Sequence, residues 1–66
     1  MRRNLISCRN KKGYTQKQFA EMLNITERQY QRIEQGKSDG TIKLWIKIKS
    51  LLAQPIDYLI QQNNLI

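Results

Sequence analysis

The 66-residue sequence contains no histidine and only one cysteine, and these scarcities exclude several classes of function. Cys8 cannot form an internal disulfide, and without histidine it has no partner for a zinc site or a nucleophile pair. The five acidic residues are scattered singly, so no carboxylates are paired for acid–base catalysis. We therefore expect no enzyme, no metal site and no cofactor.

Long apolar runs are also missing. No stretch approaches the roughly twenty residues of a membrane span, and the first residues lead into a mixed segment without a signal-peptide core. A single cysteine suits a reducing compartment, so we expect a cytoplasmic protein. A chain of 66 residues suits one domain spanning residues 1–66, close to the lower size at which an apolar core holds a fold.

Positive charge is in excess. Twelve Lys and Arg oppose five Asp and Glu, which gives a net charge of +7 and a pI of about 10.0. From Ser50 onward the only charged side chain is Asp57. A basic part followed by a neutral, apolar end indicates one surface for a polyanion and another for protein. An anionic membrane is the competing partner, but no expected helix joins a basic face to a wide free apolar face. Nucleic acid is favoured and no membrane partner is expected.

Two similar helix starts occur at residues 14–19, YTQKQF, and 25–30, ITERQY. In each, a threonine can accept from the backbone N–H three residues later while the glutamine there reaches back, and flanking apolar residues can form a hydrophobic staple. The cap-to-cap separation of Thr15 and Thr26 accommodates a helix of roughly eight residues and a tight turn. This spacing is typical of a helix-turn-helix.

The apolar periodicity predicts an all-α fold of five short helices. Gly13 and Gly36 are expected to end the first and third helices, and Asn24 to take a left-handed conformation in the turn. The expected ranges are about 2–11, 16–23, 27–35, 42–53 and 55–61, with Pro55 in the first helical position of the last. The expected inward residues are Leu5, Cys8, Phe19, Ala20, Leu23, Tyr30 and Ile33.

The segment from Ile42 to Lys49 is ambiguous, because apolar residues alternate in it as they would in a strand. However, the apolar pattern continues to Ala53 without a turn, Thr41 can cap a helix, and a lone strand would have no partner. We therefore predict a helix.

The run TQKQFAEMLNITERQYQRIEQGK, residues 15–37, resembles the helix-turn-helix of the XRE type, the Cro and phage-repressor class of small five-helix DNA-binding domains. The resemblance extends from Leu5 and Arg9 to LLAQPIDYL at residues 51–59. It implies a buried ion pair between Arg9 and Glu34. The chain departs from the usual pattern of this class at Asn24, Gly40, Lys49 and Ala53-Gln54.

The resemblance also implies contacts to double-stranded DNA. Gln16 would hold a phosphate at the start of the second helix, and the third helix would enter the major groove. Arg28 and Arg32 could instead be a solvated helix face, but their outward position favours DNA. Glu27 could accept from cytosine, favour the helix start by its charge, or repel phosphates. The predicted DNA-binding residues are Thr15, Gln16, Lys17, Thr26, Glu27, Arg28, Gln31, Arg32, Lys37 and Lys43.

These features together predict a sequence-specific transcriptional regulator, a repressor that binds a palindromic operator as a homodimer. Its control would come from its own concentration, from operator geometry or from an unidentified regulatory protein. A second hypothesis is a protein-interaction module, such as an antitoxin, with secondary DNA binding. RNA binding is disfavoured because the basic part offers no exposed aromatic residues for stacking.

The end of the chain, residues 50–66, carries more apolar side chains than the inward side of a two-turn helix can bury. A dimer through this region would cover the excess; a frayed tail is the alternative. Trp45 is expected in the core or in an interface. The predicted interface residues are Ile56, Tyr58, Leu59, Leu65 and Ile66.

Overall fold

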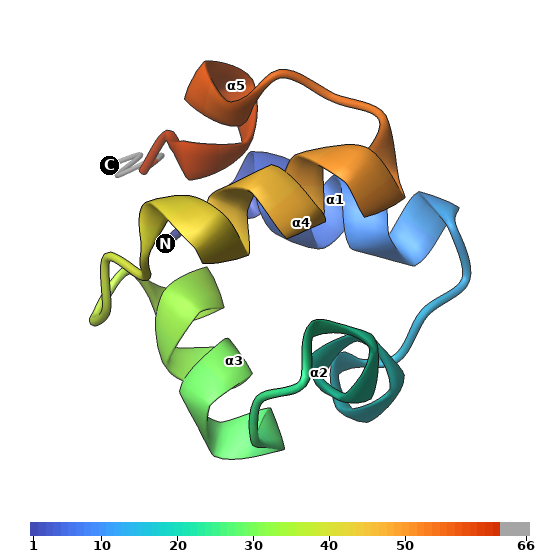
Figure 1. The fold of residues 1–66 in the computed structure, drawn as a ribbon. Helices are drawn as coiled ribbons and strands as arrows, with labels where there is room; N and C mark the ends of the chain where they lie inside the picture. Colours follow the sequence, from blue (N-terminus) through green and yellow to red (C-terminus); the bar gives the residue numbers. More distant parts are fainter. Residues whose placement is uncertain (63–66) are drawn as a thin grey trace.

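The computed structural model describes residues 1–62, which form five helices and no strand (Figure 1). The predicted all-α class is therefore confirmed. Helices α2 and α3 lie on one side of α1 and α4, and α5 lies on the other side, against both α1 and α4 (Figure 1). The helices are α1 (Arg3–Lys11), α2 (Gln16–Leu23), α3 (Glu27–Gln35), α4 (Ile42–Leu52) and α5 (Ile56–Ile60).

Helix α4 replaces the strand that the alternating pattern allowed. The Thr41 hydroxyl accepts from the Leu44 amide at 3.1 Å and caps the helix. Because α4 is a helix, its isoleucines lie on different faces. Ile48 is fully buried, whereas the side chains of Ile42 and Ile46 are 79% and 54% exposed. The alternating apolar pattern of residues 42–48 therefore does not correspond to one buried face, since two of these apolar side chains face solvent.

Two residues other than glycine end their helices in the left-handed region. Asn24 has φ 60° and ends α2 as predicted, while Ala53 has φ 54° and ends α4. Asparagine tolerates this region better than alanine does, since its short polar side chain can bond locally. Helix α5 begins one residue later than predicted, with Pro55 in the capping position.

The core receives one fully buried large side chain from each helix. The ring centroid of Phe19 on α2 lies 5.3 Å from that of Tyr30, in an edge-on arrangement, and 5.7 Å from that of the stacked Tyr14. The Tyr14–Phe19 contact is the hydrophobic staple that the sequence predicted. The five buried side chains are Leu5, Phe19, Tyr30, Ile48 and Leu59.

The predicted placement of Leu59 in a dimer interface has to be corrected. It is 0% exposed in the single chain, because α5 packs its inward side against α1 and α4. Its side chain belongs to the core of one protomer and cannot also contact a second one. Tyr58 is 42% exposed and Ile56 is half-buried against the core. Leu65 and Ile66 lie outside the described residues.

Arg2, one of the twelve basic residues, is buried. Its guanidinium donates to the carbonyls of Ile33 at 2.7 Å, Ser38 at 2.8 Å and Ile60 at 3.0 Å. It also lies 5.3 Å from the centre of the Trp45 ring. Burial lowers the pKa of Arg2, with Asp39 opposing the shift, but an arginine stays charged. Arg2 therefore joins α3, the loop after it and α5.

Candidate nucleic-acid interface

The two helix starts have the predicted capping geometry. Thr15 Oγ1 accepts from the Gln18 amide at 3.0 Å while Gln18 Oε1 accepts from the Thr15 amide at 2.9 Å. Thr26 and Gln29 repeat this arrangement at 3.1 and 2.9 Å. Each box holds the first turn of its helix in place and leaves the threonine hydroxyl its own proton to donate.

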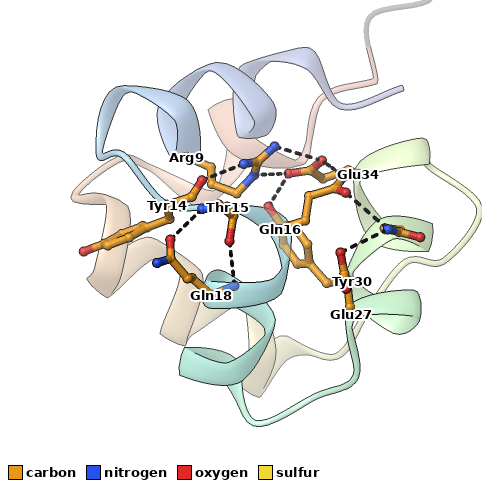
Figure 2. Close-up of polar contacts among 9 residues, drawn as sticks. Arg9, Tyr14, Thr15, Gln16, Gln18, Glu27, Tyr30 and Glu34 are labelled. Atoms are coloured by element: carbon orange, nitrogen blue, oxygen red, sulfur yellow. Dashed lines mark hydrogen bonds and ion pairs between the residues drawn. The ribbon is translucent and has the colours of Figure 1, made fainter.

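A buried ion pair joins α1 to α3 (Figure 2). Arg9 Nε donates to Glu34 Oε2 at 2.7 Å, and a second guanidinium nitrogen donates to the Tyr14 carbonyl, also at 2.7 Å. The Tyr30 hydroxyl donates to the same Glu34 oxygen at 2.5 Å. Because each buried charge has several partners, the pair can be kept in the core.

The pKa shifts follow from these contacts. Burial raises the pKa of the Tyr30 hydroxyl far above its usual value, and its hydrogen bond to the charged Glu34 adds to the rise. Burial alone would lower the pKa of Arg9, but the hydrogen bond and charge of Glu34 outweigh it, so this pKa is raised. Arg9 thus remains a cation, and Tyr30 a hydrogen-bond donor, at neutral pH.

The polar contacts continue from the ion pair to the surface. Gln16 Nε2 donates to Glu34 Oε1 at 2.8 Å, and Gln31 Nε2 donates to Gln16 Oε1 at 3.2 Å. Gln31 also reaches Glu27 in a long contact of 3.5 Å. This chain of contacts links α1, α2 and α3 (Figure 2). It restricts the rotamers of two glutamines that the resemblance assigns to DNA, so less entropy is lost when they bind a ligand.

The outward side of α3 is polar and hollowed. Glu27 and Arg28 are exposed at its start, Arg32 is exposed one turn later, and Lys37 follows its end. Within residues 1–62, no apolar residue lines the hollow. It is lined by Glu27, Arg28, Gln31, Arg32, Gln35 and Lys37, so the fold brings five predicted DNA-binding residues together.

The other predicted DNA-binding residues do not line this hollow. Thr15, Gln16 and Lys17 are at the start of α2, and Thr26 caps α3. Lys43 is exposed in the first turn of α4. Lys43 also lines a second groove, which is apolar. Lys47 lines the same groove, and this residue was not predicted from the sequence. No local pattern reveals that groove, because α2, α3 and α4 form it together.

Among residues 1–62, no helix is both long and apolar enough to cross a membrane. No group of three or more His, Cys, Asp or Glu side chains in that range could hold a metal ion.

The five helices, the tandem capping boxes and the polar outward side of α3 define a helix-turn-helix domain. A helix-turn-helix family model matches residues 5–59, and the chain belongs to this family, in its XRE-type branch. The resemblance noted in the sequence is thereby confirmed.

Two relatives from Bacillus subtilis (strain 168) are similar to this chain. The SPbeta prophage-derived uncharacterized HTH-type transcriptional regulator YonR is 35% identical over 57 residues, which are 86% of this chain and 53% of the relative. The uncharacterized HTH-type transcriptional regulator YqaE is 36% identical over 58 residues, 88% of this chain and 50% of the relative. The chain therefore spans about half the length of these curated relatives. No solved structure gives a significant match.

Proposed function

We propose that this chain is a cytoplasmic transcriptional regulator that binds specific sites on double-stranded DNA and represses transcription. The observation that carries this proposal is the outward side of α3, where polar and basic side chains surround a hollow and a buried network orients Gln16 and Gln31 beside it. Family membership and the names of both relatives, each an HTH-type transcriptional regulator, support the same function.

In the proposed complex α3 enters the major groove. Arg28 and Arg32 can donate to guanine, and Gln31 can pair with adenine by exchanging its 3.5 Å contact to Glu27 for the base. Gln16 uses one of its two amide protons on Glu34 and keeps the other for a phosphate at the start of α2. Thr15, Lys17 and Thr26 would assist at the two helix starts, while Lys37 and Lys43 would follow the DNA backbone.

We further propose that the protein acts as a homodimer on a palindromic operator. Exposed Tyr58 and half-buried Ile56 leave apolar surface on α5, on the side of the molecule away from α2 and α3. A two-fold contact there would repeat the recognition helix along the DNA, about 34 Å or one turn away. The proposal includes Leu65 and Ile66 among the residues of this contact.

An interaction module such as an antitoxin is the second candidate. It is favoured by Ile42 and Ile46, two large apolar side chains that are more than half exposed on α4. Two results together would favour this function instead: the chain purifies from its natural host with a stoichiometric protein partner, and it has no measurable DNA affinity.

The first prediction concerns the mode of DNA binding. Because basic side chains would displace counterions from phosphates, the logarithm of the affinity should fall linearly with the logarithm of salt concentration, with a slope of several units. A site obtained by selection from random DNA should still bind at salt that releases unselected duplexes. Fluorescence anisotropy would measure both. Equal affinity for every duplex at all salt concentrations would refute sequence-specific regulation.

Single substitutions sharpen this test. At the selected site, Arg28→Ala or Arg32→Ala should each cost about 1 to 3 kcal/mol and relax the base preference, because a base contact is lost. Lys37→Ala should weaken all sequences alike and lower the salt slope by about one. Lys49→Ala, an exposed position on α4, is the matched control. Identical profiles for the Arg28, Arg32 and Lys37 variants would contradict the assigned face of α3.

A further inference from the structure

An apolar groove with a volume of about 750 Å³ lies between α2, α3 and α4. Its apolar residues come from three segments, with Leu23 and Ile25 around the turn, Ile33 on α3, and Leu44 and Ile46 on α4. Ile46 is 54% exposed. A groove of this size accommodates one or two large apolar side chains, whose transfer from water would stabilise a complex.

The groove carries charge of one sign. Arg32, Lys43 and Lys47 line it, and none of the described residues that line it is acidic. Three cations around an apolar floor fit a ligand that combines apolar side chains with carboxylates. An amphipathic helix with acidic flanks meets both requirements, since residues three and four apart share a face.

We propose that this groove binds an acidic amphipathic segment of a partner protein. DNA supplies negative charge, but its apolar groups in the grooves are single thymine methyls, which are too small to cover Leu44 and Ile46. A second copy of this chain would bring another net charge of +7 toward the three cations. The charge of the groove therefore favours a partner of opposite charge over self-association.

Occupation of the groove would also affect DNA binding, a consequence that depends on the proposed function. Arg32 lines both the apolar groove and the polar hollow on the outward side of α3. Lys43, proposed to contact the DNA backbone, lines the apolar groove as well. If carboxylates of the partner form ion pairs with Arg32 and Lys43, these two side chains can no longer contact DNA. An acidic partner would therefore compete with the operator.

The test uses a displayed library of short helical peptides in which apolar, acidic and basic residues vary at every position. The full chain is the target, at an ionic strength of about 0.15 M. We expect enriched peptides with apolar residues at spacings of three and four and with acidic flanks. No enrichment, or enrichment without acidic bias, would overturn the proposal.

Matched variants locate the binding of the enriched peptides. Affinity should fall at least about tenfold for Ile46→Ser and for Lys47→Glu, which change the groove. It should change less than about twofold for Ile42→Ser and Lys49→Glu, exposed positions on α4 that do not line it. Thermal unfolding checks that all four variants are folded. Equal losses in groove and control variants would refute the site.

Two further measurements separate this proposal from its alternatives. If sedimentation shows wild-type self-association that Ile46→Ser abolishes and Ile42→Ser keeps, the groove belongs to a second copy and the proposal is wrong. Selected DNA should displace bound peptide; simultaneous binding would refute the competition. If no DNA binds at all, the proposed function fails, whereas the direct peptide measurement still decides the docking site.

Discussion

Glu34 is the residue on which the polar contacts of the domain converge. It is 2% exposed, and its two oxygens accept from Arg9, Tyr30 and Gln16. Tyr30 is one turn before it on the same helix, so their contact could be anticipated from spacing. The contribution of Gln16 could not, because this residue reaches Glu34 from another helix.

The second prediction concerns the free energy of unfolding at neutral pH, measured by urea denaturation. Arg9→Met or Glu34→Leu alone should cost about 3 kcal/mol, because each leaves the opposite charge buried and unpaired. The double variant should cost clearly less than the sum of the two. Arg3→Met, at an exposed position on the same helix, should change stability by less than about 0.5 kcal/mol. Strict additivity would show that the pair does not interact energetically.

At the scale of helices and turns, local contacts at the helix ends determine where each helix begins and stops. Helices α2 and α3 have the predicted bounds because their capping boxes are local and complete. Helix α1 begins at Arg3 instead of Arg2, which has non-helical backbone angles and donates its backbone N–H to the Glu34 carbonyl at 2.7 Å. Helix α4 ends on Ala53 in a left-handed conformation that usually belongs to glycine.

The third prediction is that Ala53→Gly stabilises the fold by about 0.5 to 1 kcal/mol. Relief of left-handed strain, worth roughly 1 to 2 kcal/mol, should exceed the added entropy of the unfolded chain. Thermal and urea unfolding would measure the change. Ser50→Gly, at an exposed right-handed position in the last turn of the same helix, should destabilise by about 0.5 kcal/mol. A loss of stability in both variants would contradict the strain at Ala53.

At the scale of the whole molecule, the described residues measure 32 × 23 × 23 Å. Two copies in side-by-side contact would therefore place equivalent helices at a separation comparable with one turn of DNA, about 34 Å. Burial of Leu59 reduces the surface available for this contact, and exposed Tyr58 becomes its central described residue.

The fourth prediction is that Tyr58→Glu raises the dimer dissociation constant at least about tenfold, because a charge would replace an apolar contact. Met22→Glu, on α2 and similarly exposed, should leave it unchanged. Sedimentation velocity across micromolar concentrations would measure both. Truncation after Gln61 should weaken the dimer too, and should lower affinity for a palindrome more than for a half-site. A wild-type chain that is monomeric at high micromolar concentration would refute the proposed homodimer.

The sequence by itself determined the helices, because capping boxes, left-handed turn residues and apolar spacing act within a few residues of one another. It also indicated the basic character and the family of the chain. Only the tertiary structure decided that Arg2 and Leu59 are buried, that Gln16 joins the buried ion pair, and that Arg32 lies between a polar hollow and an apolar groove. These features depend on contacts between segments that are distant in the sequence. Such contacts follow from how the helices pack against one another, which no local sequence pattern records.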